Sequence, residues 1–302
     1  MNLNKSISIP EINHKYLPAL SRFFSPIVME NIAQNINSKY LAEVCLNSGL
    51  MKQIDPEMSL GDFFDWIYSI LFTCYRNEYI YKNVITNKVL LGKHSLNTSI
   101  MLSEFRVGKC KADVVILNGT STAYEIKSEF DSFSRLENQI SVYLKIFDHI
   151  NVITTILQAS KLESILPDKI GILILNDRNE ISTVRKSKSN KVNIDQNLLF
   201  DSLRKNEYLE IISEYFGDIP NVQNTLIFKE CKRLFNKIPP ETAHDLAIKV
   251  LRNRSDVDAL CQFISVAPSS LSAYAMSICE ESKKMKNLIP RFSQKLGSIL
   301  VV

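Results

Sequence analysis

Apolar residues recur at steps of three and four positions along residues 25–50, which predicts an amphipathic helix. A second run of the same period covers residues 59–89. Its first residue, Ser59, can cap the free amides of the first helical turn, and Asp62 follows three positions later, as in a capping box. Most of the first 90 residues are therefore expected to form two long helices.

The pattern then changes to short apolar runs typical of β-strands, over residues 104–107, 112–117 and 122–127. The turn pair Asn118-Gly119 separates the last two runs, so we expect them to form a hairpin. Two more runs of this kind cover residues 151–156 and 170–175. Together the runs predict a mixed sheet of about five strands.

Helical patterns connect and follow these strands. Residues 135–147 carry an apolar stripe of helical period, and Ser134 and Glu137 have the spacing of a capping box. A shorter helix is expected over residues 159–165, and the chain after residue 191 is expected to be helical to its end. The basic stretch 178–191 has no periodic apolar face and predicts a hairpin or a surface loop.

This order of elements predicts an α/β fold in which helices flank a mixed sheet. Only 8 glycines and 10 prolines punctuate the 302 residues, too few for the turns of an all-β sandwich or propeller. We expect a helical N-terminal extension over residues 1–58, a core over residues 59–195 and a helical C-terminal region over residues 196–302.

Composition narrows the class of protein. Hydrophobic residues make up 45% of the chain and charged residues 23%, which is typical of a globular protein and excludes a disordered one. The net charge of +4 is small, so any nucleic-acid site must be local. The six cysteines form no CxxC pair, which indicates reduced thiols and gives zinc no support. Without an apolar window long enough for a membrane span, we expect a cytoplasmic protein with no membrane contact.

One E-x-K triplet stands apart because it lies in a strand-like run. Alternation along a strand puts Glu125 and Lys127 on the same face. A three-residue loop over residues 118–120 would bring Asp113 opposite Glu125, on that face, whereas a two-residue loop would turn Asp113 away. We prefer the register that unites the charges.

Two carboxylates on adjacent buried strands repel each other unless a cation or a proton intervenes. Mg²⁺ is commonly held by one or two carboxylates, so Asp113 and Glu125 form a candidate site for Mg²⁺, for which Mn²⁺ could substitute. Lys127, just beyond them, could orient or deprotonate a water molecule for hydrolysis.

Asp113 followed by Glu125-Ile126-Lys127 resembles the motif of the PD-(D/E)xK nucleases, which have the restriction-endonuclease-like fold. The resemblance covers about residues 62–175. The segment YEIKSEFDSFSRLENQ is especially similar to an uncharacterised bacterial family of this superfamily. The sequence departs from the motif at the proline of the family name, where it has Ala112.

The resemblance extends to the following helix, where Gln139 and Tyr143 reproduce the Q-x-x-x-Y motif of the RecB-like branch. It implies that both act with Lys127 in catalysis. Arg135, Gln139 and Tyr143 are spaced i, i+4 and i+8, so they line one edge of the helix, and donors such as Arg135 and Gln139 there would suit a substrate phosphate. Residue patterns leave other readings open: Tyr143 could be plain core, Gln139 could bind a loop carbonyl, and Arg135 could pair with a neighbouring acid.

The resemblance also implies metal ligation by Asp113, Glu125 and the Ile126 carbonyl, with a further acid upstream. The apolar stripe of the 59–89 helix continues at Glu78, which predicts a carboxylate on its buried face. Glu78 is therefore our choice for the upstream acid, and Glu104 on the first strand is the competing candidate.

The implied activity is Mg²⁺-dependent hydrolysis of phosphodiester bonds in DNA, of a kind used in bacterial defence against foreign DNA. The alternative is an inactive module of the same fold that binds nucleic acid or regulates other proteins. The helical C-terminal region could provide the interface of a homodimer or of a partner protein.

Overall fold

The computed structural model describes residues 10–35 and 38–300. The chain divides into two compact units. One unit combines residues up to 83 with residues from 258 onward, and the other holds residues 84–257. This division differs from the three consecutive segments expected from the sequence, because helices from both ends of the chain pack together in one unit.

The first unit is helical. Its N-terminal part contains α1 (Leu17–Ser21), α2 (Pro26–Ala33), α3 (Lys39–Ser48) and α4 (Leu60–Cys74). Its C-terminal part contains α13 (Val257–Val266), α14 (Ser272–Ser277) and α15 (Ser282–Leu288). Helix α15 packs against α2, and Lys284 of α15 lies 3.0 Å from a carboxylate oxygen of Glu30. The single helix predicted over residues 25–50 is therefore wrong, since two shorter helices fill this range.

The long helix predicted over residues 59–89 begins as expected but is interrupted. The Ser59 hydroxyl accepts the Asp62 N–H at 3.0 Å, which confirms the predicted cap. Helix α4 ends at Cys74, Tyr75 adopts an extended φ of −158°, and α5 (Glu78–Ile85) starts anew. A π-helical turn (Thr86–Leu90) and α6 (Leu91–Lys93) continue α5. Asn77 precedes α5, in keeping with the preference of asparagine for helix starts.

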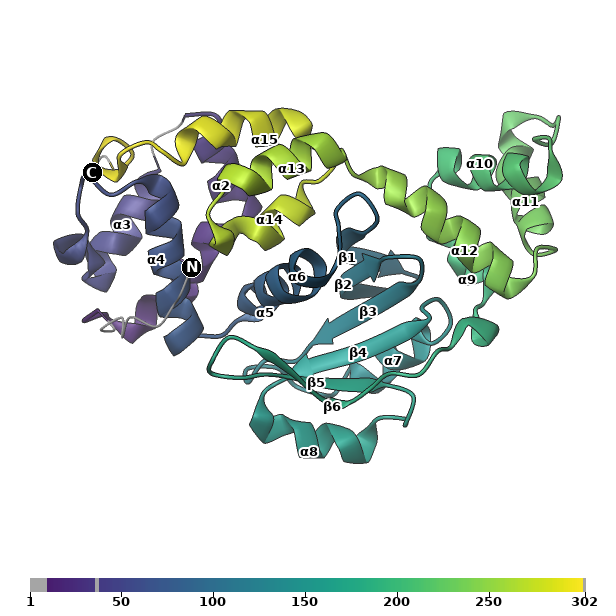
Figure 1. Cartoon of the computed structure of the whole chain (residues 1–302), viewed down its shortest axis with the longest axis horizontal. Helices are drawn as coiled ribbons and strands as arrows, with labels where there is room; N and C mark the ends of the chain where they lie inside the picture. The colour runs from purple at the N-terminus through teal and green to yellow at the C-terminus, as the bar shows by residue number, and fades with distance from the viewer. Residues whose placement is uncertain (1–9, 36–37, 301–302) are drawn as a thin grey trace. The chain divides into compact units, whose positions relative to one another are not determined.

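The second unit is built on a six-stranded sheet with strands in the order β1 to β6 (Figure 1). The strands are β1 (Ile100–Val107), β2 (Cys110–Leu117), β3 (Ser121–Ile126), β4 (His149–Thr154), β5 (Gly171–Leu175) and β6 (Ile181–Arg185). Strands β3, β4 and β5 are parallel, while the β1–β2, β2–β3 and β5–β6 pairs are antiparallel. The predicted mixed sheet is confirmed, with β6 as an additional strand in the basic stretch.

The second unit also contains helices that connect and follow the strands. They are α7 (Leu136–Tyr143), α8 (Ile156–Ile165), α9 (Gln196–Asp201), α10 (Lys205–Phe216), α11 (Asn224–Phe235) and α12 (Pro240–Leu251). Helix α7 packs against β2, α8 against β5 and α9 against β1. The capping box expected before α7 does not form: Arg135 is the N-cap, and Ser134 accepts a hydrogen bond from the Ser132 hydroxyl instead. The protein is thus an α/β protein, as the sequence predicted.

The β2–β3 hairpin has the register chosen from the sequence. Leu117 pairs with Ser121, so the loop holds three residues, 118–120. Gly119 in this loop has a φ of 90°, a left-handed conformation that glycine adopts without strain. None of the helices that the structure describes is both long and apolar enough to cross a lipid bilayer.

Candidate functional site

The candidate site lies where β3 ends, next to Asp113 of β2. The register of the hairpin places Asp113 opposite Glu125, one position beyond the last pair of the ladder. There Asp113 Oδ2 accepts the backbone N–H of Ile126 at 2.7 Å, so a side chain continues the contact between the strands. This hydrogen bond fixes the carboxylate beside the E-x-K triplet.

Lys127 lies between two side chains that the sequence analysis also predicted as site residues. Its ammonium donates to Glu125 Oε1 at 2.8 Å and to Gln139 Oε1 at 3.1 Å. The Lys127 and Glu125 side chains are only 9% and 1% exposed. Removing two charges from water costs several kcal/mol per ion, which their attraction offsets only with good geometry. Gln139 points into the charged cluster, the orientation expected from its helical position.

Tyr143 completes the environment of Glu125. It lies one turn after Gln139 on α7 and is fully buried. Its hydroxyl lies 2.8 Å from Glu125 Oε2 and 2.6 Å from the carbonyl oxygen of Lys111. Burial raises the pKa of Tyr143, and the charge of Glu125 raises it further, so the hydroxyl remains a donor at neutral pH. Glu125 Oε1 therefore accepts from Lys127, while Oε2 and the Lys111 carbonyl share the single hydrogen of the Tyr143 hydroxyl.

Strand β1 brings a further carboxylate to the same region. Glu104 and Asp113 occupy opposed positions in the β1–β2 register, between the pairs Ser103↔Val114 and Phe105↔Ala112, and the ladder is interrupted there. Like charges directly opposed on two strands disfavour pairing. Glu104 has a φ of 56°, a left-handed conformation that costs a residue with a side chain about 1–3 kcal/mol. Strain of this kind is common at functional sites.

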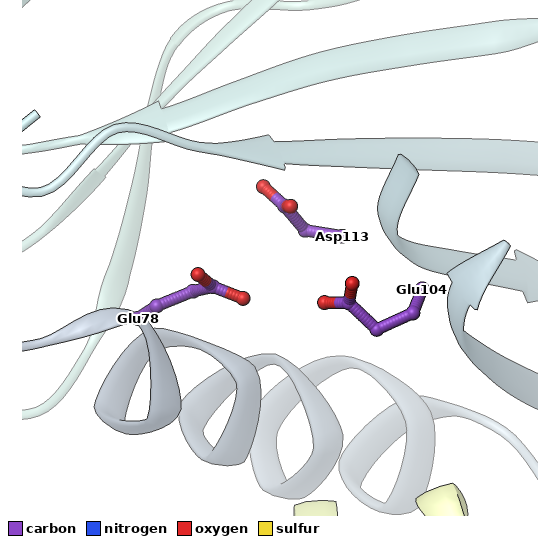
Figure 2. Close-up of side chains that lie close together, drawn as sticks. All are labelled: Glu78, Glu104 and Asp113. Atoms are coloured by element: carbon purple, nitrogen blue, oxygen red, sulfur yellow. The ribbon is translucent and has the colours of Figure 1, made fainter. Parts of the chain in front are cut away.

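Figure 2 shows Glu104 and Asp113 together with Glu78, the first residue of α5. One carboxylate oxygen from each of the three residues lies within 4.8 Å of the other two. This spacing fits ligands of one hard divalent cation, whose metal–oxygen distances are about 2.0–2.6 Å. Both candidates for the upstream acid therefore belong to this group. Glu125 is not one of these three residues, and its two oxygens lie against Lys127 and Tyr143.

Glu78 does not lie on a buried helix face, and that prediction is wrong. Its side chain is 51% exposed and lies 2.6 Å from Lys82, one turn further along α5. The stripe of α4 stops at Cys74, and the interruption at residues 75–77 gives α5 a new rotation about its axis. A periodic pattern read across this interruption assigned Glu78 to the wrong face.

The remaining predicted residues contribute less to the cluster. Arg135 is exposed at the start of α7. In the basic stretch, the Arg185 guanidinium donates to the carbonyls of Leu166, Pro167 and Ile170, which end α8 and precede β5. Lys191 pairs with Asp245 at 2.7 Å. Part of the basic stretch therefore serves the fold.

Thr154 and Gln158 also belong to the site, but the sequence pattern did not predict them. The buried Thr154 hydroxyl donates to the Lys127 carbonyl at 2.7 Å. With its amide nitrogen turned toward β3, Gln158 donates to Thr154 Oγ1 at 2.7 Å and to the carbonyls of Lys127 and Ser128 at 3.2 and 3.3 Å. No local pattern could reveal them, because the contact depends on the parallel pairing of β3 with β4.

The fold and this cluster define an α/β protein with a buried charged site at the carboxyl end of a central strand. A family model described as Bacteriophage P4 protein cII matches residues 73–273, well over half of the chain, and the chain belongs to this family. The matched range contains every residue of the candidate site.

Two individual proteins are similar to this chain. Protein cII of Enterobacteria phage P4 is 21% identical over 216 residues, which cover 69% of this chain and 80% of that protein. A solved structure of a protein of unknown function from Silicibacter pomeroyi is 17% identical and covers 42% of this chain and 87% of its own, with a TM-score of 0.28. A TM-score this low supports no conclusion about fold or function.

Proposed function

We propose that this protein is a metal-dependent nuclease that hydrolyses phosphodiester bonds in DNA. The observation that carries the proposal is the buried cluster in which Lys127 contacts both Glu125 and Gln139, beside Asp113. A buried lysine–glutamate pair is costly for a purely structural role, because desolvation of the two charges offsets much of their attraction. A restriction-endonuclease-like core would place these residues on one sheet face, and the mixed sheet is compatible with it.

The carboxylates of Asp113, Glu104 and Glu78 would hold the divalent cation, since their oxygens have the required spacing. Bound there, Mg²⁺ would stabilise negative charge that develops on the phosphate. The Asp113 hydrogen bond to the Ile126 N–H would keep this ligand in place while Glu78 and Glu104, which are exposed, adjust.

Lys127 would contact the reacting atoms. An ammonium has three N–H donors, and Lys127 uses two of them on Glu125 and Gln139. The third could donate to the attacking water or to a phosphate oxygen. Attack of water on phosphorus would then break one P–O ester bond and leave a hydroxyl on one product and a phosphate on the other. Tyr143 would hold Glu125, and so act as a positioning residue.

Cleavage of plasmid and linear DNA in Mg²⁺ or Mn²⁺, compared with EDTA, tests the proposal. We expect Asp113→Asn to reduce cleavage at least about 100-fold, because it removes a ligand charge while the amide oxygen still accepts the Ile126 N–H. Asp168→Asn is the matched control, since that carboxylate is 93% exposed and distant in sequence from the site. Absence of cleavage by the wild-type protein on every substrate would contradict the proposal.

One observation favours the alternative of a nucleic-acid-binding module without turnover. Both oxygens of Glu125 have protein donors, so this carboxylate is structurally satisfied without a cation. Calorimetry with Mn²⁺ separates the two functions. Mn²⁺ binding that is lost in Asp113→Asn supports the nuclease, whereas DNA binding with no metal binding supports the module.

A further inference from the structure

Helices α10 and α11 form a hairpin with an apolar, exposed tip. The two helices contact each other, and the Tyr208 and Phe228 ring centres lie 5.9 Å apart, so α11 runs back along α10 (Figure 1). Residues 217–223 connect them. The large apolar side chains around this connection are 40–47% exposed, and we refer to them as the apolar tip: Tyr215, Phe216, Ile219, Val222 and Leu226.

The side chains of the apolar tip gather at one end of the hairpin. Tyr215 and Phe216, whose ring centres are 4.9 Å apart, end α10, and Leu226 lies in the first turn of α11. The Val222 N–H donates to the Pro220 carbonyl at 3.0 Å, which tightens the connection between the helices. Single exposed apolar residues are ordinary, but a group of this kind marks an interaction surface. Aromatic residues such as tyrosine and phenylalanine are also enriched in protein–protein interfaces.

The two helices of the hairpin carry opposite charges near the tip. Acids lie on α10 and just after it: Glu210, Glu214 and Asp218. Bases lie on α11: Lys229, Lys232 and Arg233. Lys205 does not change this division, because it begins α10 at the end away from the tip. Glu230 pairs with Arg233 at 2.9 Å, and α11 still keeps an excess of positive charge.

Part of this charge is available to a partner. Glu214 pairs with Lys249 at 2.8 Å and Lys232 with Asp201 at 2.6 Å, so these charges are already compensated within the chain. Among the residues that the structure describes, none forms an ion pair with the remaining acids of α10 or with the first base of α11: Glu210, Asp218 and Lys229. The hairpin therefore offers acids on one helix and a base on the other.

Opposite charges on its two helices make this surface complementary to a copy of itself. A two-fold axis through the tip places α10 of one copy beside α11 of the other, so acids face bases on both sides of the axis. The acids of α10 would repel a phosphate backbone or an anionic lipid surface. A partner with charges of one sign would match only one of the two helices. The charge pattern therefore favours a second copy of this chain.

We propose that the α10–α11 hairpin joins two copies of this chain as a two-fold dimer. The apolar tips of the two copies pack together in the centre of the interface, where contact excludes water. Around this centre, Glu210 and Asp218 of each copy face Lys229 and Arg233 of the other copy. The dimer does not depend on the proposed nuclease activity, because its residues lie on helices that follow the sheet in the chain.

Analytical ultracentrifugation of the full chain over a range of concentrations measures the dimer. We expect the double variant Phe216→Ser/Leu226→Ser to raise the dissociation constant at least about 30-fold, because it removes two apolar anchors from the centre of the interface. Ile156→Ser/Leu157→Ser is the matched control, since these apolar side chains of α8 are 73% and 87% exposed. The control should dimerise like the wild-type protein.

An exchange of charges tests the identity of the partner. Glu210→Lys/Asp218→Lys and Lys229→Glu/Arg233→Glu should each weaken self-association at low salt, because like charges then face each other. An equimolar mixture of the two variants should recover dimers, because the basic helices of one variant face the acidic helices of the other. Circular dichroism checks that each variant keeps its fold, as expected for changes at exposed positions.

A wild-type protein that stays monomeric at every concentration would overturn the inference, and so would a dimer that the tip variant leaves intact. A mixture of the charge variants that recovers no dimer, or charge variants that dimerise alone as well as the wild-type protein, would also contradict it. Sedimentation with phosphatidylcholine vesicles tests the other occupant. A monomeric wild-type protein that binds these vesicles, while the tip variant does not, would assign the tip to a lipid surface instead.

Discussion

Glu125 is the most buried charged side chain of the site. Its two neighbours determine how much free energy the burial of its charge costs. Lys127 supplies a compensating charge at 2.8 Å, and Tyr143 supplies a hydroxyl at the other oxygen. Breaking a buried ion pair by removing one partner is much more harmful than replacing both, because the remaining charge has no compensation. The same two residues therefore contribute to the stability of the protein and to its proposed catalysis.

Lys127→Met should lower the free energy of unfolding by about 3–5 kcal/mol, because Glu125 is left charged, buried and unpaired. The double variant Glu125→Gln/Lys127→Met should recover most of this loss. Urea denaturation of the wild-type protein, both single variants and the double variant measures the coupling. If the losses simply add in the double variant, the two side chains do not stabilise each other.

Glu104→Gly should raise the free energy of unfolding by about 1 kcal/mol, because glycine adopts a φ of 56° without strain. The same change removes one carboxylate from the group with Glu78 and Asp113, so the affinity for Mn²⁺ should fall. Urea denaturation and calorimetry check the two effects. Glu57→Gly, an exposed acid outside the sheet, is the control and should not stabilise the protein.

At the scale of elements, α12 is joined to the sheet by a buried polar contact. His244 of α12 is 1% exposed, and its Nε2 lies 2.8 Å from the Ser121 hydroxyl at the start of β3. The Ser121 oxygen also accepts the Asp148 N–H, so its hydroxyl hydrogen is available to Nε2. His244 Nδ1 lies 3.2 Å from Asp245 Oδ1. Neutral His244 therefore satisfies both contacts.

Burial lowers the pKa of His244 below its usual value of 6.5, although the hydrogen bond to Asp245 opposes this. A histidine whose folded pKa is depressed contributes stability above pH 6.5 and loses it as the pH falls. We expect the free energy of unfolding to decrease from pH 7.5 toward pH 5, and less steeply in His244→Gln. Urea denaturation across this range measures the slope, with His14→Gln, an exposed histidine, as control. Equal slopes in all three proteins would contradict the assignment.

Asp148 holds the segment after β6 against the sheet. Its protonation affects stability at a lower pH than that of His244. Burial alone would raise its pKa, but hydrogen bonds from Ser189, Thr120 and the Asn190 N–H outweigh burial and lower it to about 2. A depressed carboxyl pKa contributes stability above pH 3.8 that disappears as the pH falls toward 2. Asp148→Asn should therefore lower stability by up to about 2 kcal/mol at neutral pH and flatten its dependence between pH 4 and pH 2. Thermal unfolding at several pH values provides the measurement.

At the scale of the whole molecule, the two units differ in which parts of the chain form them. The sheet and the helices that cover it come from one continuous stretch, residues 84–257. The helical unit needs both ends of the chain, since α2 packs against α15 and α4 packs against the short helix Ser269–Leu271. A continuous stretch can bury its own core without the rest of the chain.

A fragment of residues 78–257, which keeps α5 whole, should fold alone and unfold cooperatively. Its apolar sheet faces are covered by helices that the fragment itself contains. A fragment of residues 1–83 should not fold, because it lacks the C-terminal helices of its unit. Circular dichroism and thermal unfolding test both fragments. An unfolded 78–257 fragment would show that its stability depends on the other unit.

The sequence by itself determined the features that depend on residues close together in the chain. Alternation and loop length left two registers for the β2–β3 hairpin, and the one chosen because it brings Asp113 opposite Glu125 is the register of the structure. Helical period placed Gln139 on the side of α7 that meets Lys127. These features depend on neighbours within about 30 residues, so the pattern of the chain contains them.

Only the tertiary structure decided the rest, because it depends on how the strands pair and where the helices break, which the periodic pattern does not record. Pairing of β1 with β2 set Glu104 against Asp113 and gave Glu104 its left-handed backbone. Parallel pairing of β3 with β4 brought Thr154 and Gln158 to Lys127, and the interruption after Cys74 turned Glu78 toward water. Packing free energy outweighs the small local preferences that a sequence pattern records, and therefore it fixed these positions.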